Sequence, residues 1–286
     1  MQNSPQKINP LIGMMRQPKI YIRLPSNGNY WPDGALTVNP NGEYPVYSMT
    51  AKDELVLKTP DALLNGQAVV DVIQSCVPNI LNAWECPQID LDVILVAIRL
   101  ATYGEKMDAS ISVKEIDATY SVDLKEVIDN LYANVSWDEV VEVGTNLKVH
   151  VKPLNYKKIS AAAAQTFETQ RIINLVNDDT LEEEQKVEMF KKSFNKLTEL
   201  TLAVIVDSIF SVETTSGIVT DTDFIKEFME NCDRNVFNLI KDHLDNLREK
   251  NAVKPLKVQA TTEMIEAGSP AEIEIPIVFD PASFFG

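Results

Sequence analysis

The sequence predicts an α+β fold: a β-rich N-terminal arm, a small mixed α/β region, a region of long helices and a C-terminal β-hairpin. Three observations support this prediction. Turn-forming residues cluster in residues 1–58, apolar residues recur at helical spacing in 156–250, and apolar and polar residues alternate in 251–286. Residues 59–155, between these segments, carry both patterns, and 45% hydrophobic residues suffice for a buried core.

The N-terminal arm, residues 1–58, combines a strand pattern with turn sequences. Residues 20–24 (Ile-Tyr-Ile-Arg-Leu) alternate as a strand does. Residues 26–29 (Ser-Asn-Gly-Asn) and 39–42 (Asn-Pro-Asn-Gly) are typical of turns, where Asn and Gly adopt positive φ at little steric cost. We therefore expect strands and turns in this arm.

The mixed region begins with a helix-start sequence. Thr59 is a good N-cap, and Pro60 suits the first helical position because its missing N–H would be unpaired there. Apolar residues at helical spacing follow as far as Pro78, where we expect this helix to end.

Two further helices and a hairpin are expected before residue 155. Helical spacing of apolar residues predicts a helix from Asp90 to Gly104, and another over residues 123–132. Residues 137–151 predict a hairpin, because apolar residues alternate on both arms around a three-residue Gly-Thr-Asn turn at 144–146.

The remaining chain predicts three long helices followed by strands. The helices are expected over residues 157–177, 180–213 and 221–250, and helices this long bury an apolar stripe against each other or against a partner. Residues 256–259 and 273–277 alternate at period two and predict the C-terminal hairpin.

Charge and cysteine content limit the partners. Forty-two acidic against 26 basic residues give a net charge of −16, which a phosphate backbone would repel, so we expect no nucleic-acid partner. The acidity suits either solubility or a basic protein partner. The longest apolar run, 93–98, is too short to span a bilayer, so no membrane partner is expected. Three widely spaced cysteines do not form a disulfide framework and no secretory signal is visible, so synthesis in a reducing cytoplasm is expected.

No catalytic constellation stands out. The two histidines, His150 and His243, belong to no zinc-protease pattern, and the glycines form neither a phosphate-binding loop nor a nucleophile elbow. No Cys-x-x-Cys pair provides metal-ligand spacing. We expect no enzyme activity, no catalytic residue, no cofactor and no metal. A glycosidase-like pair of carboxylates is the alternative that the sequence leaves open.

Several ordered strings carry a family resemblance. They are residues 24–28 (Leu-Pro-Ser-Asn-Gly), 44–54 (Tyr-Pro-Val-Tyr-Ser-Met-Thr-Ala-Lys-Asp-Glu), 58–66 (Lys-Thr-Pro-Asp-Ala-Leu-Leu-Asn-Gly), 75–78 (Ser-Cys-Val-Pro), 90–92 (Asp-Leu-Asp) and 98–104 (Ile-Arg-Leu-Ala-Thr-Tyr-Gly). The chain thereby resembles the baseplate hub subunit and hub-assembly family of T-even-like contractile-tailed phages, over roughly residues 18–135 and again in its Phe-Phe-Gly ending.

The resemblance implies a structural component of the central hub of the tail baseplate. Such a protein is made in the host cytoplasm, resides in the virion baseplate and contacts other baseplate or tail hub proteins, with a second copy as a further partner. The alternative is a chaperone-like assembly factor absent from the virion. Many family members carry Cys-x-x-Cys pairs like those of zinc ribbons, but residues 112–123 and 258–273 hold no cysteine here, so the resemblance does not imply zinc for this chain.

Aromatic side chains are the candidate interface anchors, because large rings bury much area at low entropic cost. The candidates are Trp31, Tyr44, Tyr47, Tyr103, Phe284 and Phe285. The alternative for the last two is a tail folded back on the chain's own core.

Overall fold

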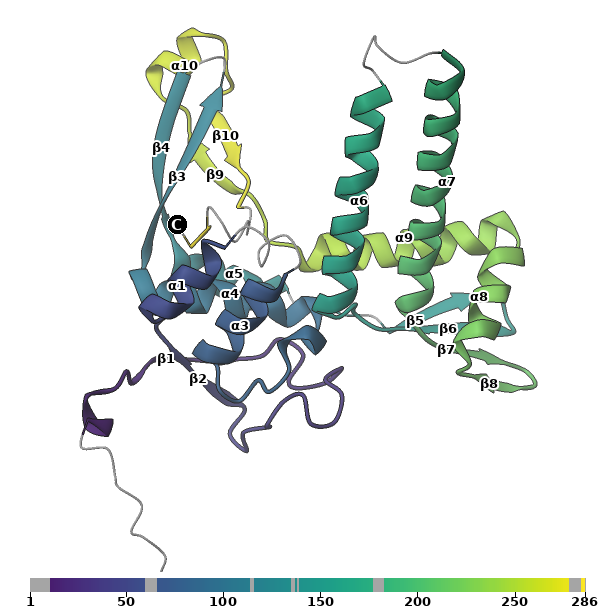
Figure 1. The fold of residues 1–286 in the computed structure, drawn as a ribbon, viewed down its shortest axis with the longest axis horizontal. Helices are drawn as coiled ribbons and strands as arrows, with labels where there is room; N and C mark the ends of the chain where they lie inside the picture. The colour runs from purple at the N-terminus through teal and green to yellow at the C-terminus, as the bar shows by residue number, and fades with distance from the viewer. Residues whose placement is uncertain are drawn as a thin grey trace, which may run out of the picture.

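The structure is a computed structural model that describes residues 11–59, 66–113, 116–134, 137, 139–176, 183–277 and 284–285. Two hydrophobic cores organise these residues: one gathers side chains between Ile22 and Leu131 together with the C-terminal phenylalanines, and the other gathers side chains between Val141 and Leu247. Small antiparallel sheets and helices surround both cores (Figure 1), which confirms the predicted α+β class.

The N-terminal segment contains one helix that the sequence analysis missed. After the short 3-10 turn η1 (Ile12–Met14), β1 (Pro18–Arg23) pairs antiparallel with β2 (Glu43–Tyr47), as the strand pattern predicted for part of this arm. Residues 51–57, expected as strand or turn, form α1 (Ala51–Leu57). The reason is a capping box: Thr50 Oγ1 accepts from the Asp53 N–H at 3.2 Å, and Asp53 Oδ2 accepts from the Thr50 N–H at 2.7 Å.

The first core is built around a helix that is apolar on every side. The helical elements here are α3 (Gln67–Cys76), the 3-10 turn η2 (Ala83–Glu85), α4 (Gln88–Tyr103) and α5 (Leu124–Asn134). Almost all apolar residues of α4 are buried, as expected for a helix surrounded by protein. The predicted helix end at Gly104 is confirmed, and its φ of 93° suits glycine.

The structure describes only part of the segment in which the first helix was predicted to start. Thr59 donates its hydroxyl to the Leu55 carbonyl oxygen at the end of α1, and residues 60–65 lie outside the described part of the chain. The described helix begins at Gln67, and it ends at Cys76, two residues before Pro78.

Two strand pairs lie beside each other at one end of the molecule (Figure 1). They are β3 (Lys106–Val113) with β4 (Ile116–Asp123), and β9 (Leu256–Gln259) with β10 (Glu272–Ile275), the latter joined through α10 (Thr262–Glu266). The C-terminal hairpin was predicted from its alternating residues and is confirmed. The Tyr120 hydroxyl donates to the Gln259 carbonyl oxygen at 3.0 Å and joins the two pairs.

The second core lies on a four-stranded antiparallel sheet. Its strands, in spatial order, are β5 (Val140–Val143), β6 (Leu147–Val151), β7 (Ile209–Thr214) and β8 (Gly217–Val219). The first two are the predicted hairpin of residues 137–151. The associated helices are α6 (Tyr156–Val176), α7 (Glu183–Asp207), α8 (Thr222–Asn231) and α9 (Arg234–Asn251).

Two of the three long-helix predictions need correction. The helix expected over 180–213 ends at Asp207, because the following Ile209–Thr214 pairs with β6 as strand β7. The helix expected over 221–250 is two helices, because Asp233 caps a new start by accepting from the Asn235 N–H at 2.8 Å.

A buried carboxylate ties the N-terminal loop to α4. Asp90 is fully buried, and its side chain accepts hydrogen bonds from the Ser26 N–H at 2.7 Å, the Ser26 hydroxyl at 2.6 Å and Trp31 Nε1 at 2.8 Å. The loop after β1 is thereby held against the first turn of the central helix.

A glycine allows α6 to approach the first core closely. Gly66 has a φ of 77°, and a Cβ placed on it would lie 2.6 Å from Ser160 Oγ, 3.1 Å from the Tyr156 hydroxyl oxygen and 3.3 Å from the Trp84 ring. A larger residue at this position would force these side chains or the base of α6 to shift.

Replacing Asp90 with Ala should lower the free energy of unfolding by about 3 kcal/mol, because the buried Ser26 and Trp31 donors lose their acceptor. Urea unfolding followed by circular dichroism measures this. The matched control Asp129→Ala, on the exposed side of α5, should change stability by less than about 0.5 kcal/mol. Equal effects of the two substitutions would contradict the anchoring role of Asp90.

Replacing Gly66 with Ala should destabilise the chain more than Gly34→Ala does. Both glycines have similar positive φ, 77° and 81°, but no atom lies within 4 Å of a Cβ added at Gly34. Gly34→Ala therefore isolates the backbone strain, about 1 kcal/mol. Overpacking against α6 should add about 1–2 kcal/mol for Gly66→Ala in the same unfolding measurement, and no added loss would argue against the close approach.

Candidate functional site

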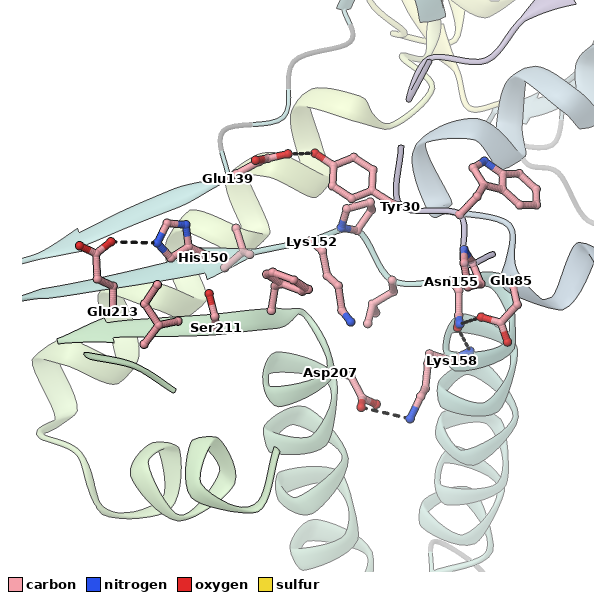
Figure 2. A pocket seen from close by; sticks show the side chains of 17 residues that line it. Tyr30, Glu85, Glu139, His150, Lys152, Asn155, Lys158, Asp207, Ser211 and Glu213 are labelled. Carbon is pink, nitrogen blue, oxygen red and sulfur yellow. Dashed lines mark hydrogen bonds and ion pairs between the residues drawn. The ribbon is translucent and has the colours of Figure 1, made fainter. Parts of the chain in front are cut away.

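A cleft of about 790 Å³ lies where the two cores meet (Figure 2). One wall comes from the N-terminal loop at residues 30–32 and from η2, and the other from β6, β7 and β8. Backbone bonds fix the junction: the Tyr156 N–H donates to the Cys86 carbonyl oxygen and the Gln88 N–H to the Leu154 carbonyl oxygen, both at 2.8 Å. Backbone hydrogen bonds therefore join the two walls at the base of the cleft.

Two polar pairs lie along the sheet side of the cleft. The Tyr30 hydroxyl donates to the Glu139 carboxylate, and His150 Nε2 lies 3.4 Å from Glu213 Oε2 (Figure 2). Burial and the bond to Glu139 raise the pKa of Tyr30, so its phenol stays protonated and remains a donor. Tyr30 also has a φ of 66°, an uncommon conformation for a bulky residue, which is retained because the surrounding contacts hold it.

Two more pairs lie at the base of α6. Asn155 Nδ2 donates to Glu85 Oε2 at 2.6 Å, and Lys158 Nζ lies 3.1 Å from Asp207 Oδ1. These contacts connect η2, α6 and the end of α7. All four carboxylates that line the cleft thus have partners within the chain.

The cleft also exposes large apolar side chains on the sheet. Phe210 on β7 and Ile218 on β8 are 61% and 68% exposed although both line the cleft. The Lys152 ammonium lies 5.8 Å from the centroid of the Phe210 ring, within cation–π range. The arrangement offers apolar surface beside the Lys152 ammonium group, which suits contact with another protein's side chains better than general acid–base chemistry.

The most perturbed carboxyl groups lie in α4, outside the cleft lining. Burial raises the pKa of Asp90 to about 6, against the lowering effect of the hydrogen bonds from Ser26 and Trp31. Burial alone raises the pKa of Asp92 to about 7. Because the Asp90 carboxylate is enclosed by the Ser26 and Trp31 donors of the loop after β1, its role is structural.

The structure places the six predicted anchors in different surroundings. Trp31 lines the cleft and donates to Asp90. Tyr44 is buried in the first core, which contradicts its expected availability to a neighbour in this conformation. Tyr47 is half-buried beneath Arg16, whose guanidinium carbon lies 5.7 Å from the ring centroid.

The other three anchors come together at the end of α4. The Tyr103 hydroxyl, on an exposed side chain, donates to the Phe285 carbonyl oxygen at 2.9 Å. The Arg99 guanidinium carbon lies 5.2 Å from the Phe284 ring centroid and 5.3 Å from that of Tyr103. Phe284 and Phe285 are buried in the first core, so the folded-back alternative describes this dipeptide and its expected exposure is corrected.

Sequence reasoning missed the apolar residues of the cleft. Phe210 was assigned to a helix, and Lys152 and Ile218 were not singled out. The β-branched and aromatic residues of 209–214 (Ile-Phe-Ser-Val-Glu-Thr) were the available signal for a strand. It was hidden by the apolar run at the end of α7.

The described residues offer neither a three-ligand metal site nor a membrane-spanning helix. Within them, no group of three or more His, Cys, Asp and Glu side chains is placed to hold a metal ion. None of their helices has the length and apolar character needed to cross a membrane.

Comparison with known protein families identifies a related family. The sequence profile of a family described as T4 bacteriophage base plate protein matches residues 19–266. No curated protein and no solved structure matches the chain. Since the profile spans most of the 286 residues, the chain belongs to the family of T4 bacteriophage base plate proteins, and its place is in the phage tail baseplate.

Proposed function

We propose that this chain is a structural subunit of the central hub of the baseplate, and that its cleft receives an apolar segment of a neighbouring hub or tail protein. Family membership supports a structural baseplate role. The observation that carries the finer proposal is the pair Phe210 and Ile218, exposed at a cleft whose carboxylates already have partners.

The physical argument concerns solvation. Full burial of a large apolar side chain stabilises a contact by about 1.5–3 kcal/mol, so two such side chains supply a substantial part of a binding energy. They stand on paired strands, so little conformational entropy is lost when a partner orders them. The Lys152 ammonium beside Phe210 favours a partner segment that carries an acceptor near its apolar residue.

The second candidate is an assembly factor that holds hub proteins and leaves before the particle is complete. The observation that favours it is the combination of a net charge of −16 with exposed apolar side chains, which suits a soluble holder of other subunits. Its contacts at the cleft would be of the same kind, but it would be absent from mature particles.

Quantitative mass spectrometry of purified particles separates the two functions. We expect a fixed, small copy number of this chain for each tail, because a hub subunit remains in the assembled structure. The reference is a set of tail proteins of known stoichiometry in the same sample. Abundance in infected-cell lysate together with absence from particles would replace the hub proposal with the assembly factor.

Replacing Phe210 with Ser should lower incorporation of the chain into particles at least tenfold, since interface rings commonly dominate binding. Complementation of a phage lacking the gene, followed by particle mass spectrometry, measures this. Phe224→Ser is the matched control, because Phe224 is 63% exposed on α8 and does not line the cleft. Normal incorporation of the Phe210→Ser chain would count against the cleft as the contact site.

A further inference from the structure

The α6–α7 helix pair distributes its side chains in an unusual way. The two helices are in contact and run side by side (Figure 1). The small polar residues Thr169 and Ser193 are buried, at 0% and 3% exposure, while large apolar side chains of the same helices face solvent. A helix pair that uses its small residues internally and exposes its rings presents a surface for a partner.

The exposed apolar residues of α7 form one strip. Val187, Phe190 and Phe194 are each more than half exposed. Their spacing of three and then four residues places them on one side of the helix, as in the seam of a coiled coil. At 1.5 Å per residue, the helix is about 38 Å long, so there is room for a second pair of helices along it.

We propose that this strip binds the same strip of a second copy of this chain, with the two α7 helices antiparallel around a two-fold axis. Val187 of one copy then lies beside Phe190 of the other, and this contact occurs twice. The resulting four-helix arrangement covers Val187 and Phe190 of both copies, which a single copy leaves in water.

Charge complementarity favours a second copy as the occupant. Glu184 and Lys191 lie seven residues apart along one edge of the strip, and no ion pair is seen for either among the described residues. With Val187 beside Phe190 of the other copy, antiparallel packing places Glu184 opposite Lys191 on both sides of the axis. A shift of one heptad would place Lys191 opposite Lys191 of the other copy, and this like-charge contact disfavours the shifted register.

The symmetry also brings the contact toward the size of a stable interface. A ring that goes from full exposure to full burial contributes roughly 150–250 Å². Phe190 is 52% exposed, so it has about 80–130 Å² left to bury, and a two-fold axis doubles this area and that of Val187. The strips and their flanking residues on both copies together supply part of the roughly 1,200 Å² at which specific protein interfaces begin.

Sedimentation equilibrium of the full chain tests the proposal. We expect the wild-type chain to dimerise and Phe190→Ser to raise the dimer dissociation constant at least tenfold. Phe167→Ser is the matched control: Phe167 is 64% exposed on α6 and lies about 200° around that helix from the buried Thr169. The control should stay within twofold of wild type. A monomeric wild-type chain at about 100 µM, or an unchanged constant for Phe190→Ser, would overturn the proposal.

Charge reversal identifies the partner surface. Glu184→Lys and Lys191→Glu alone should each weaken the dimer about three- to tenfold, because each creates two like-charge contacts. The double variant restores opposite charges at both contacts and should return the constant to near the wild-type value. Failure of the double variant to recover, with circular dichroism showing intact helices in all variants, would exclude the antiparallel register.

Discussion

The buried Asp90 carboxylate is the constraint on which the first half of the molecule depends. Three donors from Ser26 and Trp31 converge on a group that has no contact with water. A buried carboxyl without such partners would lower the stability of the fold, and so would buried donors without the carboxyl. The loop after β1 and the first turn of α4 therefore have to stay together. Because α4 is enclosed by apolar side chains, this one polar contact fixes where the loop crosses it.

The hydrogen bonds to Asp90 also position one wall of the cleft, because the loop after β1 carries Trp31. Trp31 donates to Asp90 and also lines the cleft, and its neighbour Tyr30 turns to reach Glu139 at the start of the sheet unit. On the opposite side, the close approach at Gly66 and the backbone bonds at Tyr156 hold the base of α6 against the first core. The cleft walls are thus positioned by interactions within each core and at their junction, and a partner need not organise them.

Sequence patterns identified the elements whose signals are local. The end of α4 at Gly104, the β5–β6 hairpin and the β9–β10 pair depend on turn residues and on alternation over a few positions, so they could be predicted. The boundary between Asp207 and Ile209 could not be predicted, because apolar residues resume directly after Asp207 and Ser208 and only pairing with β6 makes the second part a strand. The cleft could not be predicted either, since Tyr30, Lys152 and Phe210 meet only through the tertiary fold.

The extent to which an aromatic residue is buried distinguishes packing in the chain's own core from binding to a neighbouring protein better than its residue type does. Tyr44 and Phe285 carry the side chains expected of anchors, yet the first core encloses them. Phe210 and Phe190 are equally apolar, but they belong to neither core and are 61% and 52% exposed. A folded chain gains nothing from rings that its own cores cannot reach, and such rings limit its solubility when it is alone. In a protein of the baseplate, whose neighbours are other proteins, the rings that remain in water are the ones available to those neighbours.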